Sequence, residues 1–519
     1  MLVYVHSAKC VGIDALPITV EIDITAGVGI HLVGLADAAV RESLLRMVTA
    51  LHSKGFRIPG KKIVINLAPA DLHKSGSGYD LPIALGIVAA SEQRELPGID
   101  KFLIMGELGL DGSIRYVPGS LPVAELSAAL GLKGCIMPER AALEAVDSSD
   151  MAIYGVRDFD EVLRILSLSE PCEDLLAQNS PLYRELSSGT LISPYDDYPD
   201  FSSIIGQEGA KRGVEIAAAG GHNLIMVGPP GSGKSSLAKA MAGILPPMTR
   251  EEATVTSKVW SVSGKGESSY GLVRHRPFRA PHHSASMAAL IGGGSGDNIL
   301  PGEVSLASNG ILFLDEFCEA PKSILEALRG PMEDRKVTIS RLKSKVVYPA
   351  SFMLVAASNP CPCGYYGEGD RCTCTAGQRA TYLAKLSGPL MDRLDLQVWM
   401  HPVDTKKLVC GGKAEPTSAV AERVLRAREV QQRRFAGTQV FTNAHMGSQE
   451  LERFCPLDAA CRELLETFID KMGLSARAYS RIIKIARTIA DLAGAPDILP
   501  EHLAEAASYR FLDRRNIFE

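Results

Sequence analysis

The chain has 519 residues, of which 46% are hydrophobic and 22% are charged, and its formal net charge is −5. This length predicts roughly three domains of about 150 residues, with cores large enough to need no disulfide staples. The negative net charge gives no general affinity for nucleic acid, so any DNA contact must come from a local basic patch or a ring of subunits. The start lacks a basic segment followed by an apolar run, and 18 uninterrupted apolar residues occur nowhere, so we expect a cytoplasmic protein without a membrane span.

Three structured blocks follow one another along the chain. In residues 1–167, strand-like runs at 19–24, 62–67, 102–105 and 134–137 alternate with helix-like stretches at 36–54 and 81–91, which predicts an α/β or α+β domain. Residues 168–200 are polar and proline-bearing, as in an exposed linker. In residues 201–402, buried-looking strands alternate with helices, as a parallel sheet requires. Residues 403–519 are helical by pattern, with helices expected at 419–435, 457–471, 476–492 and 500–511.

The clearest motif is a phosphate-binding loop. Residues 224–227 form a short apolar strand, and Gly-Pro-Pro-Gly-Ser-Gly-Lys-Ser follows it directly, before a helical stretch. Backbone N–H groups of such a loop, next to a helix start, form a cradle for phosphates. We assign Lys234 to the β- and γ-phosphates of ATP and the Ser235 hydroxyl to Mg²⁺. The residues expected to bind ATP here are Gly228, Pro229, Pro230, Gly231, Ser232, Gly233, Lys234, Ser235 and Ser236.

Polar side chains follow two further apolar strands. Residues 311–314 end in Asp315 and Glu316, and we assign Asp315 to the metal and Glu316 to the base that polarises the attacking water. Residues 352–358 end at Asn359, which suits a side chain that senses the γ-phosphate or orients the water. Taken alone, Asn359 is a turn residue before a proline. Its place after the other two strands favours the catalytic role.

Four of the eleven cysteines form two C-x-C pairs within 14 residues, namely Cys361, Cys363, Cys372 and Cys374. Four thiolates on a short glycine-bearing loop can close a tetrahedral Zn²⁺ site. The spacing is tighter than in the usual C-x₂-C knuckle, so a redox-labile dithiol and four incidental cysteines stay open as alternatives. The odd total and the clustering suit a reducing cytosol better than a disulfide framework.

A short basic stretch lies between two β-favouring segments, residues 336–340 and 346–348, and predicts a hairpin that carries Arg341, Lys343 and Lys345. Lysine and arginine at such a position would contact the phosphates of DNA rather than its bases. The alternative for a short charged run is a solvated turn.

A second basic cluster, at residues 274–283, ends in His282 and His283. These histidines lack a cysteine or carboxylate at a spacing useful for metal binding, so a structural or pore-loop role is the better interpretation. The glycine-rich run at residues 292–296 predicts a mobile loop.

Three longer motifs carry a family resemblance: PFRAPHHS at residues 277–284, PGEVSLASNGILFLDE at 301–316 and GPLMDRLD at 388–395. With them, residues 201–402 resemble the AAA+ module of the branch that includes magnesium-chelatase ATPase subunits and MCM replicative helicases. Nearly the whole chain resembles a family of magnesium-chelatase-like ATPases that includes a DNA helicase of bacterial competence. The resemblance implies a P-loop AAA+ core with a helical C-terminal lid at 403–519.

The resemblance also implies functions for arginines that no local pattern reveals. Arg393 matches the arginine finger that such ATPases insert into a neighbouring subunit, which implies a ring, most simply a hexamer. Without the resemblance, a surface salt bridge with Asp392 or Asp395 would be the preferred interpretation. Arg477, at the start of a helix, matches the second phosphate sensor, with Arg481 as the competing candidate. The basic hairpin would point into the pore of the ring.

The N-terminal block resembles the proteolytic domain of Lon and a related domain of a bacterial recombination protein, which implies a ribosomal-protein-S5-like α+β fold. The match runs through KIVINLAP at residues 62–69, DLPIALG at 80–86 and GELGLDG at 106–112. Active Lon uses a Ser–Lys dyad, but here Gly78 stands where the nucleophile is expected and Ser77 is one position away. No lysine matches the general base. A serine without an adjacent base is a weak nucleophile, so we interpret residues 1–167 as a non-proteolytic domain.

Three hypotheses for the activity follow from these patterns. The first is an ATP-driven hexameric motor, a helicase or branch-migration enzyme, that acts without sequence preference on single-stranded, double-stranded or branched DNA. The family resemblance implies a role in recombination of incoming DNA during natural transformation, with recombination proteins as candidate partners. The second is a chelatase-like or chaperone-like AAA+ ATPase that remodels a protein partner. The third, an ATP-dependent protease, requires a dyad that we do not find.

Overall fold

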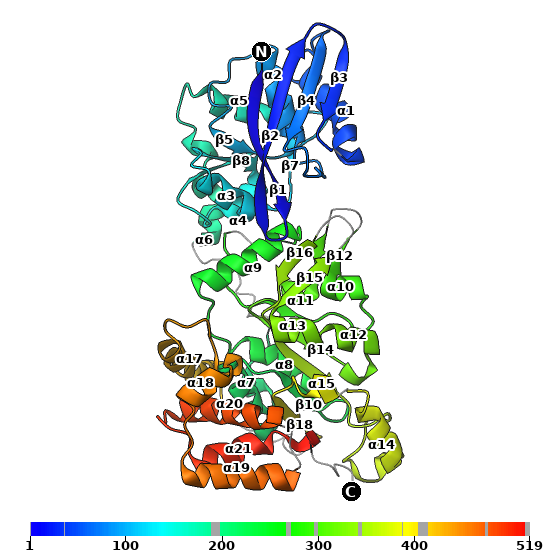
Figure 1. The fold of residues 1–519 in the computed structure, drawn as a ribbon, viewed down its shortest axis with the longest axis vertical. Coiled ribbons are helices and arrows are strands. Elements are labelled where there is room, and N and C mark those ends of the chain that lie inside the picture. The colour runs from blue at the N-terminus through cyan, green and yellow to red at the C-terminus, as the bar shows by residue number, and fades with distance from the viewer. Residues whose placement is uncertain are drawn as a thin grey trace.

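The computed structural model describes residues 2–35, 37–187, 198–265, 271–294, 299–340, 345–386, 388–402, 414–472 and 476–513. Figure 1 shows an elongated molecule with the N-terminal block, in blue and cyan, at one end. The central block, in green and yellow, lies in the middle, and the C-terminal helices, in orange and red, lie beside its lower half. Among the described residues, no helix is both long and apolar enough to cross a membrane.

The N-terminal block is built on a seven-stranded mixed sheet with the order β3-β4-β2-β1-β5-β8-β9. Strand β4 shows why these residues form a sheet, because every second residue, namely Ile63, Ile65 and Leu67, is a buried aliphatic side chain. Helix α2 is apolar on all sides after Asp80 and is buried along its whole length. The strands are β1 (Val3–Val11), β2 (Asp14–Thr25), β3 (Gly29–Val33), β4 (Lys62–Ala68), β5 (Phe102–Ile104), β8 (Gly134–Pro138) and β9 (Ala152–Val156), with β6 (Glu107–Leu108) and β7 (Ile114–Arg115) in a separate hairpin. The helices are α1 (Ala38–Ser53), α2 (Asp80–Ala90), α3 (Ser120–Ala129), α4 (Glu139–Ala145) and α5 (Phe159–Ser167).

The segment after α5 differs from the exposed linker that the sequence predicted. Two 3₁₀ turns, Glu173–Leu175 and Ala177–Asn179, and helix α6 (Pro181–Ser187) belong to the N-terminal block. Cys172 and Ala177 are buried in its cores, and the Tyr183 hydroxyl donates to Asp147 at 2.7 Å. The prediction of an exposed linker from residue 168 was therefore wrong for its first half. Its composition is polar, but a few small apolar side chains suffice to anchor it. The end of the expected linker, residues 188–197, lies outside the described residues.

The central block contains a five-stranded parallel sheet with the order β11-β14-β17-β10-β18. The three inner strands are buried at every residue, because helices cover a parallel sheet on both faces. The strands are β11 (Phe278–Arg279), β14 (Ile311–Leu314), β17 (Met353–Ser358), β10 (Leu224–Val227) and β18 (Leu396–Trp399). The helices are α7 (Glu208–Gly220), α8 (Lys234–Ala242), α9 (Arg250–Val262), α10 (Met287–Ile291), α11 (Glu303–Leu306), α12 (Lys322–Ala327), α13 (Arg329–Asp334), α14 (Ala376–Leu383) and α15 (Gly388–Met391).

Two hairpins are inserted into the central block. Strands β15 (Lys336–Ser340) and β16 (Lys345–Pro349) pair antiparallel, as the sequence predicted. Strand β12 (Gly292–Gly293) pairs with β13 (Leu300–Pro301). The start of the glycine-rich run is thus part of a hairpin rather than the expected mobile loop, and residues 295–298 lie outside the described residues.

The N-terminal block contacts the central block through α9 and the β15–β16 hairpin (Figure 1). The Ser261 hydroxyl on α9 donates to Glu144 at 3.2 Å, and Ser120 donates to the same carboxylate at 2.8 Å. A Cβ atom on Gly12, in the β1–β2 turn, would lie 3.2 Å from atoms of β16, so the turn is packed closely against the hairpin. The expected DNA-binding hairpin therefore contacts the N-terminal block near the start of β16, at Val346 and Val347.

The C-terminal helices share one hydrophobic core with the central sheet. Arg481 pairs with Asp395, just before β18, and Thr488 bonds to His222, just before β10, at 2.8 Å. Phe511 packs edge-on against Trp399, at the carboxyl end of β18. The phosphate-binding loop follows the carboxyl end of β10, and the expected lid over ATP stays a prediction. The helices are α17 (Thr417–Arg434), α18 (Ser448–Phe454), α19 (Ala459–Met472), α20 (Ala476–Ala493) and α21 (Pro500–Ser508).

Candidate functional site

The phosphate-binding loop connects β10 to α8, as its sequence predicted. Gly231 and Gly233 have φ angles of +76° and +89°, which glycine adopts without the strain of other residues. Gly228 is needed for a different reason, because a Cβ there would lie 2.5 Å from the carbonyl oxygen of Met400. The loop therefore keeps its shape through three glycines and ends at the first turn of α8, where Ser235 and the exposed Ser236 lie.

The Lys234 ammonium group is held inside this loop. It is 8% exposed and donates to the carbonyl oxygens of Gly228 and Pro229 at 2.7 and 2.8 Å. Burial lowers the pKa of Lys234, and the nearby Asp315 carboxylate opposes that shift. A buried ammonium group bonded only to neutral carbonyls can exchange them for the phosphate oxygens of a nucleotide.

The residues expected to hold Mg²⁺ lie together. Asp315 follows β14, and its carboxylate accepts a hydrogen bond from the Ser235 hydroxyl at 2.8 Å. Ser235 lies in the first turn of α8, after β10, and β10 and β14 are separated only by β17 in the sheet. A hydroxyl and a carboxylate are oxygen ligands of the kind that Mg²⁺ takes alongside phosphate and water, so this pair fits the ion.

Asn359 follows β17, between the other two strands. Its side-chain oxygen accepts a hydrogen bond from Lys234 at 3.4 Å, and the Ser358 carbonyl accepts one from the N–H of Gly228 at 3.2 Å. Adjacent parallel strands bring their carboxyl ends to one edge of the sheet. Three segments that are far apart in sequence thus contribute Lys234, Asp315 and Asn359 to one site.

Glu316 has a neighbour that sequence reasoning did not find. The backbone of Glu316 is in the left-handed region, with φ +50°, and its side chain is half exposed. His283 Nδ1 lies 3.0 Å from its carboxylate, whereas His282 bonds to Ser284 instead. The dipeptide His-His gave no signal for this contact, because it depends on how the loop after β11 passes the end of β14.

Arg393 lies at the opposite edge of the sheet from Lys234. Its carbonyl oxygen accepts a hydrogen bond from the side chain of Asn223 at 3.0 Å, and Asn223 immediately precedes β10. The phosphate-binding loop starts after β10, at Gly228. A strand rises about 3.3 Å per residue, so Gly228 lies about 16 Å from Asn223. Within one chain, Arg393 is therefore remote from the phosphates that Lys234 would hold.

The ion pairs of Arg393 also differ from the expected ones. Its guanidinium group pairs with Glu333 on α13, rather than with Asp392 or Asp395. Asp392 pairs instead with Arg477 at 3.2 Å. The candidate second sensor Arg477, an exposed residue at the start of α20, thus lies beside the candidate finger and not beside Lys234.

These arginines border a hollow of about 200 Å³ with more basic than acidic side chains around it. Arg335, which sequence reasoning missed, also lines this hollow, and burial lowers its pKa. Asp395 is nearly fully buried, but the His222 ring, whose Nδ1 lies 3.6 Å from its carboxylate, and the positive charge of Arg481 hold its pKa well below the usual range. The charged side chains that line the hollow are Arg335, Arg393, Arg477, Arg481, Lys484, Glu333, Asp392 and Asp395.

The basic hairpin is only partly described. Lys345 is the first residue of β16 and is exposed. Arg341 and Lys343 lie outside the described residues, so their expected contact with DNA stays a prediction.

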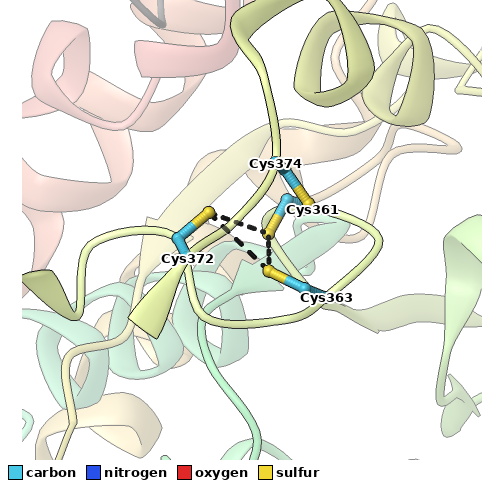
Figure 2. A group of neighbouring side chains, drawn as sticks. All are labelled: Cys361, Cys363, Cys372 and Cys374. Atoms are coloured by element: carbon cyan, nitrogen blue, oxygen red, sulfur yellow. Dashed lines mark hydrogen bonds between the residues drawn. The ribbon is translucent and has the colours of Figure 1, made fainter. Parts of the chain in front are cut away.

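The four clustered cysteines converge in the loop after Asn359 (Figure 2). Their sulfur atoms all lie within 4.8 Å of one another, although two C-x-C pairs eight residues apart supply them. Cys361 is buried, which raises the pKa of its thiol to about 12. The backbone N–H of Tyr365 lowers the pKa of the Cys363 thiol to about 6.

In the N-terminal block, the Ser77 hydroxyl donates to the Glu107 carboxylate. The Lys74 ammonium group is buried and donates to the carbonyl oxygen of Pro69. A carboxylate acceptor for Ser77 differs from the lysine base that a Ser–Lys protease needs.

The comparisons with known proteins agree with this geometry. Residues 200–408 match the family model described as magnesium chelatase, subunit ChlI, residues 20–141 match that of subunit ChlI of Mg-chelatase, and residues 414–510 match that of its C-terminal region. The chain is 42% identical to the competence protein ComM of Haemophilus influenzae over 99% of this chain and 98% of ComM. It is 42% identical to the uncharacterized protein YifB of Escherichia coli over 98% of this chain and 97% of YifB.

A weaker match concerns the N-terminal block. An archaeal Lon protease of Methanocaldococcus jannaschii is 23% identical over 150 residues, which are 29% of this chain and 23% of that protease. The matches to ComM and YifB instead cover nearly the full length of each pair of proteins. They include the parallel sheet and the phosphate-binding loop that follows β10. The chain therefore belongs to the family of magnesium-chelatase-like AAA+ proteins that includes ComM and YifB.

Proposed function

We propose that this chain is an ATP-driven DNA motor that works as a ring, most simply a hexamer, in the recombination of incoming DNA during natural transformation. The observation that carries the proposal is the separation of Arg393 from Lys234 by the length of β10. A finger at one edge of the sheet and a phosphate loop at the other complete a site only when a second subunit supplies the finger. Rings of identical subunits with such head-to-tail contacts are closed by rotation.

Within each site, the residues of one chain divide the work. The Lys234 ammonium group and the backbone N–H groups of the loop would bind the phosphates, and Ser235 with Asp315 would hold Mg²⁺, which neutralises charge on the phosphoryl group. Glu316 would take the proton of the attacking water, and Asn359 would orient that water or sense the γ-phosphate.

The neighbouring subunit supplies the cations. Arg393 stabilises the charge that develops on the transferred phosphoryl group, and Arg477, paired with Asp392 beside it, reaches the same site. The excess of basic side chains around the hollow, with Arg335 among them, supports an anionic occupant such as the phosphates of the adjoining subunit's ATP.

DNA is the proposed substrate for two reasons. The first is the relative of 42% identity over nearly the full length, which is named a competence protein. The second is the basic hairpin, whose strand β16 begins with the exposed Lys345. Contacts from Arg341, Lys343 and Lys345 to phosphates would be independent of sequence and would weaken with salt.

The N-terminal block is proposed to be a non-proteolytic Lon-like, S5-like domain that supports the hairpin. The packing of the β1–β2 turn against β16 gives it that position. The bond from Ser77 to Glu107 supports the absence of a Ser–Lys dyad at that serine.

A motor that remodels a protein partner is the second candidate, because three segments of the chain match models of a magnesium chelatase subunit. ATP turnover by the purified chain, measured with and without branched DNA, separates the two. The DNA motor predicts a several-fold rise in turnover that disappears as the salt concentration increases. Turnover that is indifferent to every DNA tested, but rises with a protein partner, would favour the second candidate.

A further inference from the structure

The loop between β17 and α14 is long and has little regular structure. From Asn359 to Thr375 it contains only a three-residue 3₁₀ turn, Gly369–Arg371. A loop of this length inside a compact block usually has a function or an added constraint that holds it. Aromatic contacts supply part of that constraint, because the Arg371 guanidinium stacks 4.4 Å from the Tyr365 ring and that of Arg379 stacks 4.5 Å from the Tyr366 ring.

The sulfur atoms in this loop have the spacing of a tetrahedral metal site. Cys361 and Cys363 are 3.3 Å apart, and the Cys372 sulfur lies 3.9 and 3.7 Å from them. Four sulfurs placed tetrahedrally at about 2.3 Å from Zn²⁺ would be about 3.8 Å apart. In Figure 2 the four side chains, Cys374 included, point toward one centre from two arms of the loop.

We propose that Cys361, Cys363, Cys372 and Cys374 bind one Zn²⁺ ion per chain, and that this ion fixes the loop against the phosphate-binding loop. Each thiol releases its proton when it binds, so the ion is held by four thiolates. An iron–sulfur cluster would have to fit between the cysteines, and sulfurs less than 4.8 Å apart leave room for one ion only. The cysteine thiols described by the structure are free, so no disulfide competes for them.

Two contacts connect the proposed zinc site to the residues that would bind ATP. A Cβ atom on Gly364, between the two cysteine pairs, would lie 3.1 Å from the ring of Pro230, so the cysteine loop touches the phosphate-binding loop directly. Cys361 is also only two residues from Asn359, whose side chain accepts from Lys234. Without the ion, both contacts depend on an irregular loop that has lost its main constraint.

The first test is the zinc content of the full-length chain, purified without added metal and without a histidine tag. Elemental analysis should find one zinc per chain in the wild type and in Cys10→Ser, which changes a cysteine outside the loop. It should find little in Cys363→Ser and in Cys372→Ser. X-ray absorption at the zinc edge should report four sulfur ligands at about 2.3 Å.

The second test measures the binding of a fluorescent ATP analogue before and after zinc is released by a mercurial thiol reagent and the reagent is removed with excess thiol. If about a tenth of zinc-free molecules keep the loop in place, the apparent affinity falls about tenfold, and it recovers when Zn²⁺ is added back. Both tests are independent of any DNA activity.

Three results would overturn the proposal. The first is a wild-type chain without metal in which the four thiols of this loop react freely with a thiol reagent. The second is a full equivalent of zinc in Cys363→Ser, and the third is iron in place of zinc in the wild type. ATP binding that does not change when zinc leaves would overturn the coupling to the phosphate-binding loop.

Discussion

Replacing Arg393 with alanine is expected to lower ATP turnover by about 10³-fold or more, which is the range of an arginine finger. The loss should fall on turnover and not on ATP binding, because Lys234 and the loop glycines are at the other end of β10. Steady-state hydrolysis and the affinity for a fluorescent ATP analogue measure the two separately. Arg329→Ala is the matched control, since it removes an ion pair with Glu326 on the adjacent helix α12 and should leave turnover nearly unchanged.

Mixing two inactive variants tests whether Arg393 acts between subunits. Lys234→Ala and Arg393→Ala should each be inactive alone. In an equal random mixture, about a quarter of the interfaces would join an intact loop to an intact finger in a ring of identical contacts. We therefore expect activity to recover in the mixture. A mixture that stays inactive while rings still form would contradict a finger supplied by the neighbour.

Glu316→Gln should lower the turnover of ATP by about 10²- to 10⁴-fold, the usual contribution of a general base. The amide keeps the size of the side chain but cannot accept the proton, so ATP should still bind and accumulate unhydrolysed. A single-turnover experiment with labelled ATP measures this directly. Glu319→Gln is the control, because Glu319 is three residues away and pairs with Lys385 on the surface. Equal losses in both variants would remove Glu316 from the role of base.

Much of the arrangement of the candidate nucleotide site could be predicted from the sequence because local patterns determine it. The loop glycines, Lys234 and Ser235 lie between a strand and a helix, and the strand ends at Asp315 and Asn359 follow from apolar runs of the right length. Parallel pairing then brings these ends to one edge of the sheet without further information. The same reasoning located the β15–β16 hairpin and the four C-terminal helices that it named.

Contacts that depend on tertiary packing could not be predicted. The approach of His283 to Glu316 and the pairing of Arg477 with Asp392 join residues from different elements, and no spacing in the sequence encodes them. The segment at 168–187 was misinterpreted because its composition is polar, although Cys172 and Ala177 anchor it. The contacts of Arg481 with Asp395 and of Thr488 with His222 likewise join residues far apart in the sequence.

The central claim is that ATP hydrolysis at this site moves DNA. The most direct measurement is the displacement of a labelled strand from three-stranded and four-stranded DNA junctions by the purified chain with Mg-ATP, next to Lys234→Ala. We expect the wild type to displace the strand and Lys234→Ala to leave the junctions intact, because its loop has lost the cation that holds the phosphates. Intact junctions with a wild-type chain that hydrolyses ATP at the same rate with and without DNA would contradict the DNA motor and direct the search to a protein partner.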